Sequence, residues 1–147
     1  MKAKVNHLFK LILSALLGLL GFSSCESLSP SLMYGQPHAD FHASGKVTDP
    51  SGKGIEGIRV AVRQHGRYRN EDDTLYTNSA GQFELLNRSF DGPTAVTVVF
   101  EDIDGEEHGG RFDSQTVKPK IVQTRKGDGQ WYGGAFEVEA NAELKKQ

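Results

Sequence analysis

The sequence predicts an all-β fold, an antiparallel sandwich of about seven strands that follows a short apolar helix. From residue 41 onward, apolar side chains recur at every second position, which is the period of a strand with one buried face. Turn-forming Gly, Pro, Asn and Asp separate these runs, and no helical period appears after residue 24. A barrel is the alternative architecture, because it uses the same short strands.

The alternation places the individual strands. The first covers residues 41–47, and the polar segment 49–54 predicts the turn after it. The clearest strand covers 136–144, where every even residue is apolar and every odd residue is polar. Further strands are expected at 58–62, 74–77, 82–86 and 94–101. We expect six aromatic residues to form the bulk of the core: Phe41, Phe83, Phe100, Phe112, Trp131 and Phe136.

Length and composition limit the class of protein. The chain has 147 residues, 17 Lys and Arg against 19 Asp and Glu, and a formal net charge of -2. This length suits one ordinary domain, and this charge balance fits neither a disordered polyelectrolyte nor a nucleic-acid binder. The single cysteine, Cys25, excludes an internal disulfide framework and a cysteine-rich zinc fold.

The first 24 residues differ from the rest of the chain. Lys2, Lys4 and Lys10 make the start basic, and the apolar run 11–22 follows. Twelve residues are too few to cross a bilayer, which needs about 20 in a helix. A basic start, a short apolar run and then small residues form the pattern of a signal peptide, and we expect one over 1–24. A buried N-terminal helix is the alternative, although it would show a single apolar stripe.

Cys25 follows Ser23 and Ser24, and this placement resembles a bacterial lipobox. The resemblance implies lipid, including palmitate, attached to Cys25, and a membrane anchor in the cell envelope, at the outer membrane of a Gram-negative bacterium. The alternative is an unpaired buried thiol. We therefore expect a lipoprotein signal peptide over 1–24, the lipidated cysteine and a flexible tether over 25–39, and the β-sandwich domain over 40–147.

Two segments, 45–60 and 76–83, resemble the opening of a carboxypeptidase regulatory-like domain. The resemblance implies a transthyretin-like, Ig-like sandwich. Gly54 stands where that family usually has Pro, which leaves a more flexible turn.

A narrower resemblance covers most of the chain after Cys25. Four segments are similar to the radical-SAM-associated lipoprotein family: 33–35, 73–77, 100–110 and 127–136. His108 stands where that family is expected to have Asn. Membership implies genomic association with a radical SAM enzyme, which makes a radical SAM system the expected partner, but it implies no established activity. Modification of this chain by that enzyme is an alternative.

No complete catalytic constellation is visible in the sequence. A nucleophile needs a base and an orienting group, and no serine elbow motif is present. The acidic residues at 71–73 and 101–107 fall in predicted loops. We therefore assign no catalytic, cofactor-binding or metal-binding residue, and we expect a non-enzymatic binding or accessory module of the envelope.

Three surface features leave alternatives open. Asp102, Asp104, Glu106 and Glu107 could supply oxygen ligands to calcium. His38, Asp40 and His42 would share one face of an extended strand and could bind zinc. Trp131 and Tyr132, in the glycine-rich segment 127–136, could hold a carbohydrate or a peptide, or Trp131 could pack on the core, which we favour.

Overall fold

The computed structural model describes residues 10, 12, 13, 15, 16 and 36–147. The five N-terminal ones are helical, and within the described ranges no helix has the length and apolar character needed to cross a membrane. Residues 36–147 belong to one compact unit. Cys25 and most of the expected tether lie outside the described residues, so the signal peptide and the lipid anchor stay predictions.

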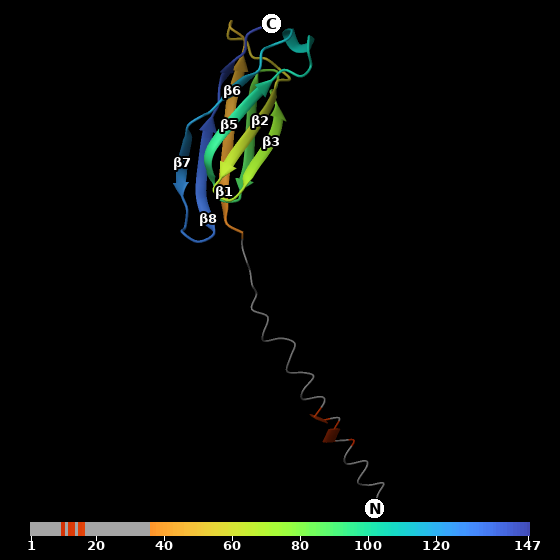
Figure 1. Ribbon diagram of the computed structural model, residues 1–147, viewed down its shortest axis with the longest axis vertical. Helices are drawn as coiled ribbons and strands as arrows, with labels where there is room; N and C mark the ends of the chain where they lie inside the picture. Colours follow the sequence, from red (N-terminus) through yellow and green to blue (C-terminus); the bar gives the residue numbers. More distant parts are fainter. Residues whose placement is uncertain (1–9, 11, 14, 17–35) are drawn as a thin grey trace, which may run out of the picture. The chain divides into compact units, whose positions relative to one another are not determined.

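Two β-sheets form the compact unit (Figure 1). Sheet I has the order β4 (Gln82–Ser89), β1 (His38–Thr48), β8 (Tyr132–Glu139), β7 (Ile121–Lys126), with β9 (Ala142–Glu143) also paired to β1. Sheet II has the order β3 (Asn70–Tyr76), β2 (Arg59–Gly66), β5 (Pro93–Glu101), β6 (Gln115–Val117). The predicted all-β sandwich is confirmed, but β1 pairs in parallel with β8 and with β9, so sheet I is mixed.

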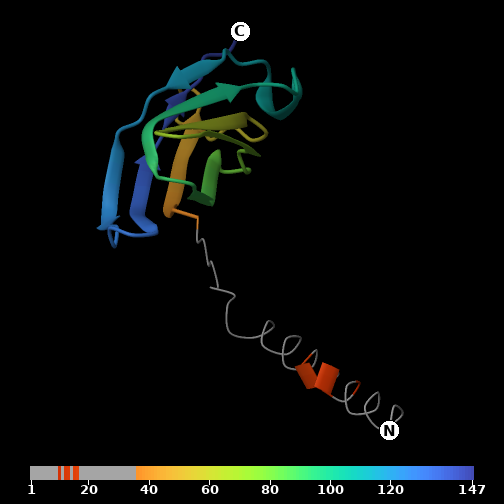
Figure 2. The same ribbon diagram turned by 60° about the horizontal axis from the view of Figure 1, so that its bottom comes forward.

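The core lies between the two sheets (Figure 2). Alternation along β1 buries Ala39, Phe41 and Ala43 and leaves the residues between them on the outer side of sheet I. Sheet II contributes Val60, Val62, Val96, Val98 and Phe100 to the same buried cluster. Each sheet therefore buries one face, as strands of period two require.

Several strand boundaries differ from the sequence prediction. The segment 136–144 is divided into β8 and β9, yet its even residues still point inward, with Val138, Ala140, Ala142 and Leu144 buried. The acidic residues 71–73 lie in the edge strand β3, so their assignment to a loop is wrong, whereas Glu101 ends β5, within the strand expected at 94–101. Neither β6 nor β7 was predicted.

Trp131 is not a core residue, and that prediction is wrong. Its side chain is 44% exposed in the turn between β7 and β8. The Asp128 carboxylate accepts hydrogen bonds from the backbone N–H groups of Gln130 and Tyr132, at 2.8 and 3.0 Å, which closes this turn on itself. Phe41, Phe83, Phe100 and Phe112 are buried as expected, and Phe136 is half-buried against them.

Candidate functional site

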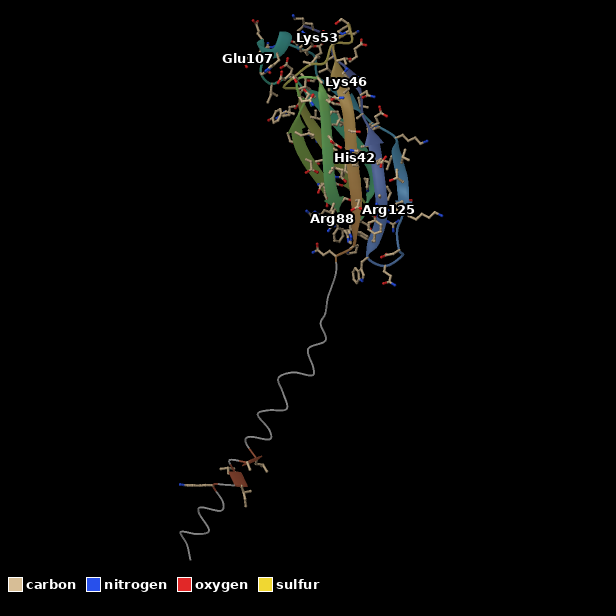
Figure 3. All side chains as sticks on the ribbon, turned by 180° about the vertical axis from the view of Figure 1, so that it is seen from behind. His42, Lys46, Lys53, Arg88, Glu107 and Arg125 are labelled. Atoms are coloured by element: carbon tan, nitrogen blue, oxygen red, sulfur yellow. The ribbon has the colours of Figure 1, made fainter. Side chains whose placement is uncertain are left out.

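Strand register places side chains in rows across the outer face of sheet I. Residues paired on neighbouring strands project to the same face. The pairs Arg88 with Asp40, Asp40 with Ala135, and Ala135 with Arg125 form one row over β4, β1, β8 and β7. His42 lies in the next row, paired with Leu86 on one side and Glu137 on the other. Figure 3 shows Arg88 and Arg125 on opposite sides of β1, with His42 farther along that strand.

These rows border a hollow on the outer face, which we call the outer hollow. Its volume is about 700 Å³, within the range of small-molecule sites. Ala135 is the only small side chain in its row, and it lies between Asp40 and Arg125. The lining combines apolar and charged groups: Asp40, Phe41, His42, Leu86, Asn87, Arg88, Thr124, Arg125, Ala135, Phe136 and Glu137.

Tyr132 holds the Asp40 side of the outer hollow in place. Its hydroxyl donates a 2.8 Å hydrogen bond to Asp40 Oδ2. Burial, and then this hydrogen bond, raise the pKa of the Tyr132 phenol above its usual value of 10.0, so it remains a proton donor at neutral pH. The Arg125 guanidinium lies over the Tyr132 ring, 5.7 Å from its centroid, in a cation–π contact. Asp40 and Arg125 are thus positioned by one aromatic side chain.

His42 has a carboxylate partner from the neighbouring strand. Its Nε2 lies 3.1 Å from Glu84 Oε1. A proton on Nε2 donated to Glu84 leaves the lone pair of Nδ1 open to a ligand. An imidazole oriented by a carboxylate is the arrangement that general-base catalysis uses.

A second cluster lies beyond the end of β5. His108 Nδ1 and Asp104 Oδ2 are 2.5 Å apart, and Glu107 completes a group whose ligand atoms lie within 4.8 Å of one another. The hydrogen bond that His108 donates to Asp104 raises the pKa of His108 above 6.5, and the same bond lowers the pKa of Asp104 below 3.8. Among the described residues, no other His, Cys, Asp and Glu side chains converge in this way.

This cluster differs from the calcium ligands considered as an alternative. Asp102 stays out of it, because its carboxylate accepts hydrogen bonds from the backbone N–H groups of Phe112 and Asp104. Glu106 is not a member either, whereas His108, which the sequence analysis did not consider as a ligand, is one. Hydrogen-bonding contacts within a folded loop cannot be read from carboxylate spacing alone.

The three residues considered for a zinc site share a face, but their ligand atoms do not converge. His38, Asp40 and His42 all lie on the outer side of β1, as predicted. Their side chains have separate partners, because His38 packs at 5.5 Å against the Tyr132 ring while Asp40 accepts from its hydroxyl. In the described part of the chain they form no metal-ligand group.

Trp131 and Tyr132 border a smaller hollow of about 320 Å³ at the β7–β8 turn, lined by Pro37, His38, Asp91, Gly127, Gly129, Gln130, Trp131, Tyr132 and Gly133. Tyr132 is half-buried and Trp131 exposed. Both aromatic residues border this smaller hollow, and Tyr132 is linked to the outer hollow only through its hydrogen bond to Asp40.

No family model matches the chain, and no curated protein matches it. A variant of catechol 1,2-dioxygenase from Acinetobacter radioresistens matches with a TM-score of 0.50 at 15% identity, over 74% of this chain and 52% of that chain. Hydroxyquinol 1,2-dioxygenase from Pseudomonas putida matches with a TM-score of 0.50 at 9% identity, over 82% of this chain and 65% of that chain. The chain spans about half to two thirds of these dioxygenases. At such identities the likeness shows a shared fold.

These matches overturn two predictions. We expected a non-enzymatic binding or accessory module, with calcium- or zinc-dependent binding or radical SAM modification as alternatives, and we expected no enzyme. Both are wrong, since the fold is one that dioxygenases have. The physical reason is that the prediction searched the linear sequence for a complete motif. A sheet face instead gathers its residues from strands far apart in the chain.

Proposed function

We propose that the chain is an enzyme that acts on a small hydroxylated aromatic acid bound in the outer hollow. The observation that carries this proposal is the row from Arg88 through Asp40 and Ala135 to Arg125, with His42 and Glu84 beside it. The dioxygenases of similar fold act on catechol and hydroxyquinol, which suggests a hydroxylated ring as the substrate.

The two arginines support an anionic substrate. Guanidinium groups bind carboxylates through paired, charge-assisted hydrogen bonds. Arg88 is exposed and has no ion-pair partner among the described side chains, and Arg125 is held over the Tyr132 ring. Leu86, 73% exposed beside them, offers apolar surface to a ring. Ala135 leaves room for a planar group between the charged side chains.

His42 is the proposed general base. Its Nδ1 would take the proton of a ring hydroxyl, and Glu84 would stabilise the imidazolium that forms. Asp40, which already accepts the Tyr132 hydrogen bond, would orient a second hydroxyl. The resulting phenolate is the product of this step.

Oxygen chemistry on a ring is carried by a metal or another cofactor. Among the described residues, the convergent His, Asp and Glu side chains are Asp104, Glu107 and His108, and none of them lines the outer hollow. The residues of the outer hollow therefore do not fit such a group, and the proposed reaction is proton transfer, without a step through oxygen.

Binding can be tested by calorimetry with 4-hydroxybenzoate and with phenol, its uncharged counterpart. We expect 4-hydroxybenzoate to bind more tightly, and Arg88→Gln to weaken it about tenfold, the effect of losing a charge-assisted hydrogen bond of roughly 1.5 kcal/mol. Arg63→Gln, an exposed change on sheet II, is the matched control. Equal affinity for phenol and 4-hydroxybenzoate would contradict the proposal.

The base can be tested separately by ultraviolet difference spectra, which distinguish a phenolate from a phenol. Wild type should bind 4-hydroxybenzoate with a phenolate signature at neutral pH. His42→Gln should retain the affinity and lose the signature, because the amide keeps the contact with Glu84 but does not take a proton. A phenolate spectrum that persists in His42→Gln would remove His42 from this role.

We further propose that Cys25 is lipidated and holds the chain at a membrane of the cell envelope, with a radical SAM system as partner. The basic start, the apolar run 11–22 and the two serines before Cys25 support the anchor. Labelled palmitate should enter the wild-type chain and not Cys25→Ala, which should leave the membrane fraction. Wild-type protein without label, recovered in the aqueous fraction, would refute the anchor.

The finer fold type that we propose is transthyretin-like. Support comes from contacts of the two segments that carry the resemblance. Val47 N–H of the first segment donates to the Gly81 carbonyl of the second at 2.8 Å, and within the first segment Ile55 N–H donates to the Val47 carbonyl at 3.1 Å. The Asp49 carboxylate closes the turn between Val47 and Ile55 by accepting hydrogen bonds from Ser51 and from the backbone of Lys53.

A further inference from the structure

The only tryptophan of the chain projects from the turn between β7 and β8. Trp131 is 44% exposed, and the turn around it carries exposed Lys126, Gly129 and Gln130. Exposed tryptophan is costly in water and favoured where an apolar region meets a polar one. We call Trp131, Lys126, Gln130 and the adjoining Pro37 the turn patch.

The chain enters the domain beside this patch. His38 N–H donates a 2.8 Å hydrogen bond to the Trp131 carbonyl, and Pro37 lines the same hollow as Trp131. Figures 1 and 2 both show the start of β1 at the same end of the unit as the β7–β8 turn, and Figure 1 shows the C-terminus at the other end. An anchor on the segment before residue 36 would therefore also keep the turn patch close to the anchoring point.

The length of chain between Cys25 and residue 36 limits the distance between a lipid on Cys25 and the turn patch. Ten residues, 26–35, lie between Cys25 and Gln36. The predicted tether would span about 20 Å on average and about 40 Å when fully extended. A lipid on Cys25 would thus present the turn patch to the bilayer at a high effective concentration.

The charges of the patch suit an anionic lipid surface. Lys126 is exposed, and Arg125 precedes it on the same strand. The acid in the turn, Asp128, stays ionised, because the hydrogen bonds that its carboxylate accepts from backbone N–H groups lower its pKa, and these bonds hold its charge against the turn backbone. Cations beside an aromatic residue form the pattern of segments that lie at membrane interfaces.

From these observations we propose that the turn patch docks on the lipid bilayer, with Trp131 inserted at the headgroup level. This inference rests on the proposed anchor at Cys25. Docking would orient the unit with the β7–β8 turn toward the membrane and the far end, with Lys53 and Glu107, away from it (Figure 3).

The test uses the full lipidated chain in vesicles of phosphatidylethanolamine and phosphatidylglycerol. Because Trp131 is the only tryptophan, its fluorescence reports this position alone. We expect Trp131 to emit at shorter wavelength than a peptide with the sequence of this turn in lipid-free buffer. Its emission should also be protected from aqueous iodide and should be mostly lost when the lipids carry bromine near the headgroups. Lys126→Glu should reduce this quenching, whereas Lys53→Glu, the same charge change at the far end, should not.

The outcomes separate the two proposals. Vesicles that float without the chain would refute the anchor and the docking together. A chain that floats while Trp131 stays open to iodide and insensitive to brominated lipid would refute docking and leave the anchor intact. An emission change caused by soluble oligosaccharide or peptide, and not by lipid, would also overturn docking and assign the patch to that ligand.

Discussion

Asp104 and His108 show how one contact shapes a loop. His108 has a φ of 50°, in the left-handed region, which brings its ring back over Asp104 and beside Gly57. Among non-glycine residues, Asn, Asp and His adopt this conformation most readily. An Asn at this position would therefore keep the backbone conformation while removing the charge.

The first prediction concerns the pH dependence of this pair. A His108 pKa raised above 6.5 gives stability that is fully present below that pH and is lost as pH rises through the raised value. An Asp104 pKa lowered below 3.8 gives stability that is present above that pH and is lost as pH falls through the lowered value. His108→Asn should therefore lower the melting temperature at about pH 5.5 and have little effect at about pH 9.

The control for this experiment is Asp104→Asn, which removes the other member of the pair. It should produce the same loss at about pH 5.5, and the double variant should be no less stable than either single one, because both remove one interaction. An equal effect of His108→Asn at both pH values would show that the ion pair does not contribute.

Gly54 illustrates close packing of two backbones. A Cβ at this position would overlap the Ala80 carbonyl and the Gly81 nitrogen, so the turn after β1 lies directly against the turn before β4. Its place in the sequence suggested flexibility. In the folded chain, the missing side chain of Gly54 instead allows the two backbones to approach closely.

The second prediction follows from that contact. Gly54→Ala should lower the free energy of unfolding by about 1–3 kcal/mol, the usual cost of forcing an extra methyl group into a packed site. Urea denaturation measures it. Gly133→Ala is the matched control, because its Cβ would meet neighbouring atoms only at 3.4 Å and beyond. Similar losses in both variants would attribute the effect to glycine itself.

Among the elements, β1 organises sheet I. It pairs with β4 along one edge and with β8 and β9 along the other, and its inner residues are buried. In contrast, β7 lies at the sheet edge, and its residues from Val122 to Lys126 are exposed. Local opening should therefore cost least at β7.

The third prediction is the order of hydrogen exchange. Amides of β1 that bond to neighbouring strands should exchange slowest within sheet I, and those of β7 fastest, because β7 has one neighbour and little buried surface. Mass spectrometry of deuterated peptides would resolve the two. Equal protection of β7 and β1 would indicate that another molecule covers the β7 edge.

Alternation predicted the strands that bury one face. The segments 41–47, 58–62 and 94–101 lie within or overlap β1, β2 and β5, each with alternating burial. It did not predict β7, because an edge strand exposed along most of its length has no apolar period. The acidic residues of β3 suggested a loop for the same reason, since β3 lies at an edge and buries no residue fully.

At the scale of the whole molecule, the site depended on information that the sequence does not carry locally. His42 and Asp40 were recognised as sharing a face, but Arg88, Arg125 and Glu84 join them only through the register of three strand pairs. A register shift of one residue would send each of them to the other face.

The fourth prediction concerns the C-terminal segment. Termini usually tolerate substitution, yet Leu144 is 1% exposed and its N–H donates to the Thr48 carbonyl at 2.8 Å. Leu144→Ala should therefore cost about 2–5 kcal/mol of unfolding free energy, as large cavities in a core do. Its exposed neighbour Glu143 provides the control, and Glu143→Ala should change stability little. A small loss in Leu144→Ala would mean that the end of the chain frays.

The parallel pairing of β1 with β8 and β9 has a consequence for synthesis. Residues 47 and 142 must meet before sheet I is complete, so ribosome-bound chains that lack β9 leave one edge of β1 partly unpaired. Sheet I is therefore completed only late in synthesis. Arrested nascent chains that stop before residue 132 should accordingly be cut by protease within β1, and full-length chains should resist.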